Sequence, residues 1–140
     1  MSTFREPFLQ AAQASLAAMY PARVVLRGLQ DFAALGDAKL RQGVYSLVAD
    51  GTKGWAEFSG REGEFGTLGF AVVGMCRVKD SDTTEALEQL EGELEAELLG
   101  WCQAIKPAPL DAVYPREAAY SRGLEHPYGW IVVTMEGLYV

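Results

Sequence analysis

Residues 80–107, DSDTTEALEQLEGELEAELLGWCQAIKP, decide the fold of this chain. Apolar residues recur there every three or four positions, which is the period of a helix with one buried face. They are Leu87, Leu90, Leu94, Leu98, Trp101 and Ile105. Asp82 and Glu85 have the spacing of a capping box at the helix start, and Pro107 stops the helix. The pattern predicts one amphipathic helix over residues 83–104.

The side of this helix away from the apolar stripe is acidic and holds small residues. Three glutamates, Glu88, Glu91 and Glu95, fall on one flank at about 100° of rotation per residue. Gly92 and Ala96 lie roughly opposite the stripe, and two interpretations stay open. Either they admit a closely packed neighbour, from this chain or from another copy, or Ala96 is only a good helix former and Gly92 costs about 1 kcal/mol.

Length and composition describe an ordinary globular protein. The 140 residues predict one domain over residues 1–140, with 49% apolar and 22% charged residues. No apolar run reaches the roughly 18 residues that span a bilayer, and residues 1–20 lack a signal-peptide pattern. We therefore expect no membrane association. Cys76 and Cys102 lack CxxC spacing, which favours a reducing compartment.

The charge balance argues against a groove that grips nucleic acid. The net charge is −7, and residues 83–104 contain six glutamates without a Lys or Arg. A nucleic-acid groove needs a basic face. Such acidity usually serves solubility, and it is also compatible with a surface past which nucleic acid slides without binding.

The rest of the chain indicates a second helix and several strands. The predicted elements are a helix over 3–20 and strands over 22–29, 44–49, 67–78 and 128–140, while 30–43 is either a helical turn or a folded-back loop and 109–127 holds at most one more strand. Gly137 indicates a bulge in the last strand. Short connections favour antiparallel pairing. The sequence thus predicts an α+β fold with two main helices packed on one face of a largely antiparallel sheet of four to five strands.

The strand at 67–78 is apolar on both faces. Leu68, Phe70, Val72 and Cys76 share one face, and Ala71, Val73 and Met75 share the other. Such a strand lies in the centre of a sheet that is covered twice. Because only two helices are clearly indicated, another subunit is a candidate for the second cover.

Residues 51–66 follow the turn signal Asp50-Gly51 and are predicted to form a protruding hairpin arm. Trp55 and Phe58 lie in this glycine-rich segment. If the arm protrudes, they anchor a protein–protein contact; if it folds back, they enter the core.

Residue chemistry alone indicates no catalytic, cofactor or metal site. His126 is the only histidine and has no companion ligands in the sequence. Cys76 and Cys102 fall in predicted core elements, where an inert thiol is the default. The glycines of residues 60–69 are spaced by three and precede a strand, whereas a phosphate-binding loop needs a helix N-terminus. We therefore expect no enzyme activity, no cofactor and no metal ion.

The order of the elements resembles a known family. A helix and a Pro-containing segment precede a Val-rich strand, a glycine-rich hairpin, an apolar strand and the acidic helix after Asp80-Ser81-Asp82. The chain closes on the strand Tyr-Gly-Trp-Ile-Val-Val-Thr-Met, residues 128–135. This layout is similar to that of the tail terminator, or tail completion, proteins of long-tailed bacteriophages, including the lambda-like and Mu-like groups. The similarity covers nearly the full chain and rests on architecture and size.

The resemblance implies a structural virion protein of the tail–neck junction that is assembled in the host cytoplasm. Proteins of this family form hexameric rings that cap the tail tube, stop its polymerisation and join it to the head connector. The implied partners are other copies of the chain, the tail tube protein and the head–tail connector protein. Genomic DNA passes through the ring without specific binding.

No functional residue transfers by motif, so the candidate residues come from their chemistry. They are Trp55, Phe58 and Arg61 for an interface on the arm, and Glu88, Glu91 and Glu95 for a channel wall or acidic surface. Two other functions stay open: a neck or head-completion protein, and a monomeric bacterial α+β domain that binds or converts a small molecule.

Overall fold

The computed structural model describes residues 5–53, 66–106 and 110–139. The elements along the chain are α1 (Arg5–Met19), β1 (Val24–Arg27), α2 (Phe32–Leu35), α3 (Asp37–Gln42), β2 (Val44–Lys53), β3 (Gly66–Arg77), α5 (Thr84–Gln103), β4 (Leu110–Tyr120) and β5 (Tyr128–Tyr139). The five strands form one sheet in the order β1-β2-β3-β5-β4. The pair β1–β2 is parallel, and the other three pairs are antiparallel.

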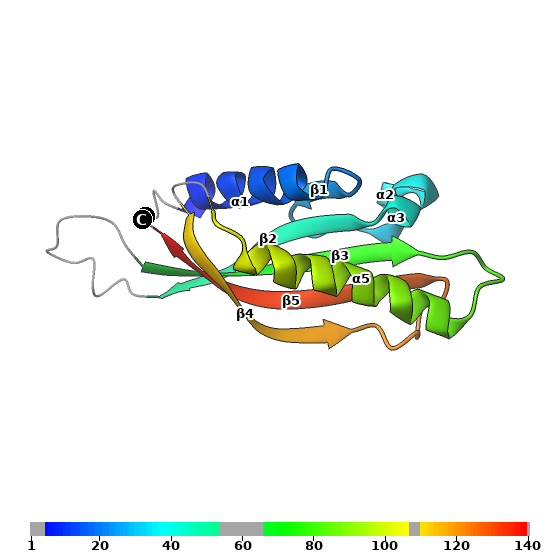
Figure 1. Cartoon of the computed structure of the whole chain (residues 1–140). Helices are drawn as coiled ribbons and strands as arrows, with labels where there is room; N and C mark the ends of the chain where they lie inside the picture. The colour runs from blue at the N-terminus through cyan, green and yellow to red at the C-terminus, as the bar shows by residue number, and fades with distance from the viewer. Residues whose placement is uncertain (1–4, 54–65, 107–109, 140) are drawn as a thin grey trace, which may run out of the picture.

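The two long helices, α1 and α5, pack on the same face of this sheet (Figure 1). The main core lies between them and the strands and includes Phe8, Leu16, Phe70, Leu98 and Trp101. This arrangement confirms the predicted α+β fold with two main helices on one face of a largely antiparallel sheet. The central position predicted for residues 67–78 is also confirmed, because β3 is the third of the five strands.

The helix that decides the fold begins one residue later and ends one residue earlier than predicted. Its N-cap is Thr83, whose hydroxyl accepts a hydrogen bond from Ala86 N at 3.1 Å. The predicted capping box of Asp82 and Glu85 is wrong. Asp82 accepts instead from Lys79 N at 3.0 Å and so stabilises the turn before the helix.

The apolar stripe of α5 is buried as predicted, except at its end. Leu87, Leu94, Leu98 and Trp101 are fully buried, and Leu90 is half-buried. Ile105 is 98% exposed, because α5 has ended and the C-cap residue Ala104 has an extended backbone. The Lys106 side chain turns back towards the helix. Its Nζ donates to the carbonyl oxygens of Trp101 and Ala104, and so supplies hydrogen bonds to carbonyl groups at the helix C-terminus.

The small residues on the back of α5 do not pack against another described element. Gly92 and Ala96 are exposed, and a Cβ built on Gly92 has nothing within 4 Å. A neighbour for them from within the described part of the chain is therefore not found, and packing against another copy stays a prediction. Helix α1 contacts the C-terminal end of α5 instead, where Trp101 Nε1 donates to Ser15 Oγ at 3.0 Å.

A polar network fastens α5 to the start of β1 and β2. Arg23 donates from Nε and Nη2 to the carboxylate of Glu97 at 3.0 and 2.8 Å. The hydroxyl of the fully buried Tyr45 lies 2.7 Å from Glu97 Oε1 and 3.0 Å from Leu94 O, and the charged carboxylate is the stronger acceptor. The Tyr20 hydroxyl donates to the Glu97 carbonyl at 2.8 Å. Three distant parts of the chain thus meet at one glutamate.

The Asp50-Gly51 pair is not a turn, against the prediction. Strand β2 continues to Lys53, and its register with β3 shifts between Ala49 and Gly51. Asp50 is therefore the extra residue of a β-bulge. Turn and bulge share the same residue preferences, so the dipeptide alone does not distinguish them.

Gly137 marks a close approach, and the bulge predicted there is wrong. Strand β5 pairs with β3 in unbroken register through this residue. A Cβ built on Gly137 lies 2.0 Å from Cζ of Phe8, so the ring from α1 rests directly on the strand. The register shifts lie on the other side of β5, in β4, before Ala112 and before Glu117.

The segment at 30–43, which the sequence left undecided, forms the short helices α2 and α3. Asp31 caps α2 by accepting from Ala33 N at 3.0 Å. Both helices lie on the second face of the sheet, at one end, where a small apolar cluster forms. Its buried members are Leu35, Leu40, Val44 and Met75.

The remainder of the second sheet face has no described helix over it. Val48, Ala71, Val132 and Thr134 follow one another across β2, β3 and β5 on this face, and all four are half-buried. We call this surface the open face. Three of these four residues are apolar, and Glu117 of the edge strand β4 lies beside Thr134 on the same face.

Candidate functional site

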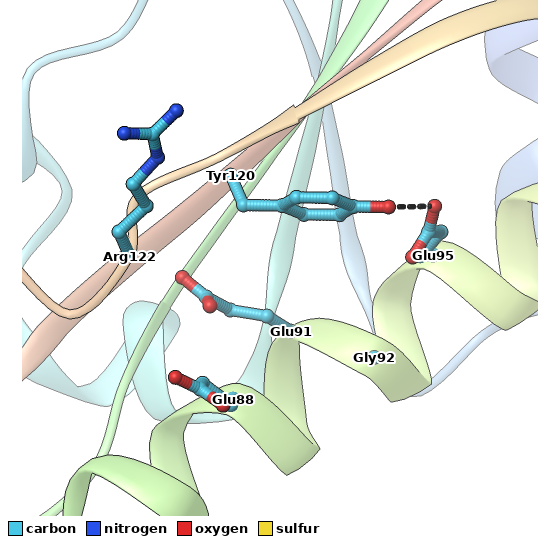
Figure 2. Close-up of a pocket in the computed structure, with 6 residues that line it drawn as sticks. All are labelled: Glu88, Glu91, Gly92, Glu95, Tyr120 and Arg122. Atoms are coloured by element: carbon cyan, nitrogen blue, oxygen red, sulfur yellow. Dashed lines mark hydrogen bonds between the residues drawn. The ribbon is translucent and has the colours of Figure 1, made fainter.

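A groove of about 360 Å³ lies between α5 and the end of β4 (Figure 2). It is lined by Glu88, Glu91, Gly92, Glu95, Tyr120 and Arg122. The first four come from two successive turns of α5, and the last two from the end of β4 and the turn that follows. The predicted flank of Glu88, Glu91 and Glu95 is therefore one wall of a groove. Gly92 adds width, since it has no side chain.

Glu91 is the buried acid of the groove. It is 4% exposed, and its Oε2 accepts a hydrogen bond from the buried Ser121 hydroxyl. Strand β5 makes room for this carboxylate, because a Cβ built on Gly129 would lie 2.5 Å from Oε2. Oε1 makes no hydrogen bond within the described residues, and Figure 2 shows the carboxylate directed towards the β4 side of the groove. Glu91 therefore belongs to the interior wall and not to an exposed acidic surface.

Tyr120 and Glu95 meet across the groove. The Tyr120 hydroxyl donates to Glu95 Oε2 at 2.7 Å, and Tyr120 remains 48% exposed. This hydrogen bond raises the pKa of Tyr120, because it stabilises the protonated phenol next to a negative carboxylate. Glu95 is therefore partly satisfied, whereas Glu88 has no hydrogen bond or ion pair within the described part of the chain.

Arg122 stands at the rim in an unusual backbone conformation. Its φ is 62°, that of Gly123 is 73°, and Leu124 N donates to Ser121 O at 3.2 Å. Two successive positive φ values are typical of a type I′ turn, where Asn-Gly is the favoured pair. Figure 2 shows the guanidinium pointing away from Glu91, and no ion pair holds it among the described residues.

Replacing Arg122 with asparagine is expected to raise the free energy of unfolding by about 0.5–1 kcal/mol, because asparagine adopts this backbone region at lower cost. Urea denaturation measures the change. Arg122→Ala is the control, since it removes the side chain but keeps the backbone cost, and it should leave stability nearly unchanged. A loss of stability in both variants would show that the arginine side chain itself contributes.

The structure brings together one of the two predicted groups of candidate residues. Glu88, Glu91 and Glu95 share the groove, whereas Trp55, Phe58 and Arg61 lie outside the described residues. Tyr120 and Arg122 were not predicted as site residues. Helical periodicity finds neighbours along α5, but no local pattern reveals that Tyr120 lies beside Glu95. The only signal was the tyrosine and arginine content of residues 109–127.

The cysteines and the histidine occupy structural positions. Burial raises the pKa of Cys76 to about 12 and that of Cys102 to about 11, so both thiols stay protonated at neutral pH. His126 Nε2 lies 2.8 Å from the carbonyl oxygen of Asp82, beside the start of α5. Within residues 5–53, 66–106 and 110–139, no three His, Cys, Asp or Glu side chains are placed to hold a metal ion.

Comparisons with known proteins do not assign this chain to a family. No protein-family model matches this chain, and no curated protein matches it. Among the described helices, none is long and apolar enough to cross a membrane. Function is therefore inferred from the sheet, the groove and the layout of the elements.

Proposed function

We propose that this chain is a tail terminator of a long-tailed bacteriophage. In this role it forms a ring that caps the tail tube and joins it to the head connector. Its partners are other copies of itself, the tube protein and the connector protein. The resemblance of layout supports this proposal, and the observation that carries it is the open face of the sheet.

The open face is suited to burial against a neighbouring subunit. It presents Val48, Ala71, Val132 and Thr134 over three central strands, with no described helix above them. Contiguous apolar surface on a water-soluble protein commonly marks a contact with another protein. Identical subunits that bury one face against a different surface of the next copy form closed rings when the rotation closes. The net charge of −7 suits a ring through which DNA passes without sticking.

The oligomeric state tests the proposal directly. Size-exclusion chromatography with light scattering, with and without the tube protein, should show a closed oligomer in at least one of the two conditions. The tube protein is included because some ring proteins are monomeric alone and assemble only on their partner. A strict monomer at every concentration, also with the tube protein present, would overturn the proposal.

Replacing Thr134 with lysine is expected to weaken this assembly strongly, because a charge in the middle of a buried interface loses its water. The fold itself should lose less than about 1 kcal/mol, since a half-exposed lysine can extend its ammonium into solvent. Light scattering reports assembly, and urea denaturation reports the fold. Gln103→Lys, on the exposed end of α5, is the control of equal charge and should assemble like the wild type. Unchanged assembly of Thr134→Lys would exclude the open face as the interface.

The groove favours a second candidate, a monomeric domain that binds a small molecule. Its volume of about 360 Å³ falls within the range of ligand pockets. Such pockets are mostly apolar, however, whereas three carboxylates and one guanidinium line this groove. A ligand that raises the melting temperature of the wild type, but not of Glu88→Gln, would favour this candidate. Binding to the connector protein in the absence of the tube protein would instead favour the alternative role of a neck or head-completion protein.

A further inference from the structure

The two edge strands of the sheet differ in how far their outward backbone N–H and C=O groups are protected from pairing with another strand. Strand β1 forms one edge and is only four residues long. On its outer side, Gln13 Nε2 from α1 donates to Val25 O at 3.1 Å. A short, side-chain-capped edge is a common protection against pairing with another strand. Strand β4 forms the other edge and spans 11 residues.

The hydrogen-bond direction along β4 follows from one contact at its end. Ser121 N donates to Trp130 O of β5 at 3.1 Å. Residues of an antiparallel strand alternate between pointing their N–H and C=O groups to one side and to the other. Glu117 and Ala119 therefore pair with β5, and Ala118 and Tyr120 direct their backbone groups outward. These outward groups have no hydrogen-bond partner within the described residues.

Only the first half of this edge is protected. Pro115 and the register shift before Glu117 interrupt the pairing surface there. After the shift, the sequence Glu117-Ala118-Ala119-Tyr120 contains no proline or glycine, and all four residues are exposed. The two alanines leave the edge sterically accessible. An extended segment can add to β4 at this point.

The groove determines which extended segment fits. Ala118 and Tyr120 pair with Val133 and Ile131, which are core residues, so their side chains are on the α5 face of the sheet. Side chains of an added strand that lie beside them on that face point towards the groove and its three glutamates. Within the residues that the structure describes, Glu88 and Oε1 of Glu91 have no partner, Glu95 accepts from Tyr120, and Arg122 is the one cation that lines the groove.

We propose that the outer edge of β4 at residues 117–120 binds an extended segment of a partner protein. That segment carries lysine or arginine at alternate positions, and these cations enter the groove beside Glu88 and Glu91. The backbone of β4 supplies the hydrogen bonds, and the groove supplies the selectivity for positive charge. Pairing of β4 with β4 of a second copy is disfavoured, because it would bring two acidic grooves of a −7 chain together.

This inference does not depend on the ring. It concerns the edge of the sheet and the groove on the α5 face, whereas the ring proposal concerns the open face. Peptide binding and oligomeric state are measured separately, so the failure of one leaves the other standing.

The test uses two short, terminally blocked peptides that alternate threonine or valine with lysine in one and with glutamate in the other. Each is titrated into the isotope-labelled protein, and backbone amide signals are followed by NMR. The lysine peptide should shift the signals of Ala118 and Tyr120 in a saturable way and bind at least about tenfold more tightly than the glutamate peptide. Its affinity should fall as salt rises from about 0.05 to 0.3 M.

Variants separate the backbone contribution from the charge contribution. Ala118→Pro removes an outward N–H without removing a bond to β5 and should abolish binding, whereas Ala118→Val keeps the N–H and should bind. Glu88→Gln changes an exposed groove residue and should weaken the affinity for the lysine peptide about threefold. Glu117→Gln, on the sheet face opposite α5, should leave that affinity unchanged.

Three outcomes would overturn the proposal. They are equal binding of both peptides or of neither, binding to Ala118→Pro at wild-type affinity, and self-association of the protein that Ala118→Pro abolishes.

Discussion

Replacing Glu97 with alanine is expected to lower the free energy of unfolding by about 3 kcal/mol. The carboxylate accepts two hydrogen bonds from Arg23 and one from Tyr45. Its removal leaves a largely buried guanidinium, whose side chain is only 14% exposed, without its hydrogen-bonded counter-ion. It also leaves a fully buried phenol without its charged acceptor. Urea denaturation measures the loss, which corresponds to a decrease in melting temperature of roughly 10 °C.

Glu93 provides the matched control on the same helix. Its carboxylate lies 3.9 Å from Arg23 Nη2, but its side chain is 56% exposed. Glu93→Ala should therefore change stability by less than about 0.5 kcal/mol. If both variants lose the same small amount, the network around Glu97 does not hold α5 to the sheet.

The same carboxylate makes stability depend on pH. Burial acts to raise the pKa of Glu97, but the hydrogen bonds from Arg23 and Tyr45 and the charge of Arg23 outweigh it, so the pKa lies below its ordinary value of 4.5. A lowered folded pKa means that this stabilisation is present above about pH 4.5 and is lost as the pH falls through the folded pKa. Between about pH 5 and pH 3 the wild type should lose more stability than Glu97→Gln. Parallel loss in both proteins would contradict this.

Replacing Gly137 with alanine is expected to lower stability by about 2–3 kcal/mol through overpacking. The added Cβ would lie 2.0 Å from Cζ of Phe8, and three atoms of that ring lie within 3.0 Å. The ring cannot simply turn away, because it is fully buried and packs edge-on against Phe70 at 5.6 Å between centroids. Calorimetry or urea denaturation measures the effect.

A double-mutant cycle identifies the cause. In the background of Phe8→Leu, which shortens the side chain, Gly137→Ala should cost less than about 1 kcal/mol. Without the clash, the substitution would even stabilise the protein slightly, because Gly137 does not have a positive φ. An equal cost in both backgrounds would show that Phe8 is not what the glycine accommodates.

Elements with a long periodic pattern were predictable from the sequence. The stripe from Leu87 to Trp101 fixed α5 to within one residue at each end. The two-residue period of β3 and β5 predicted which residues share a face of the sheet. The short helices α2 and α3 were not predictable, since six residues or fewer contain too little of a helical period.

The groove could be predicted only on its helical side. The three glutamates share a flank of α5 as a consequence of helix geometry alone. Tyr120 reaches Glu95 because β4 pairs with β5 in one register, and that register depends on bulges that no local pattern revealed. The burial of Glu91 likewise depends on Gly129, a residue 38 positions later in the numbering (129 minus 91). Such contacts between distant residues follow from the assembled sheet.

The position of β5 has a consequence for how the chain folds during synthesis. This strand lies between β3 and β4. Until residues 128–139 have been made, β3 is therefore paired only with β2, and β4 has no partner strand. Until then β3 has an unpaired edge on its β5 side, and such an edge favours aggregation. The five-stranded sheet can therefore close only after residues 128–139 have left the ribosome.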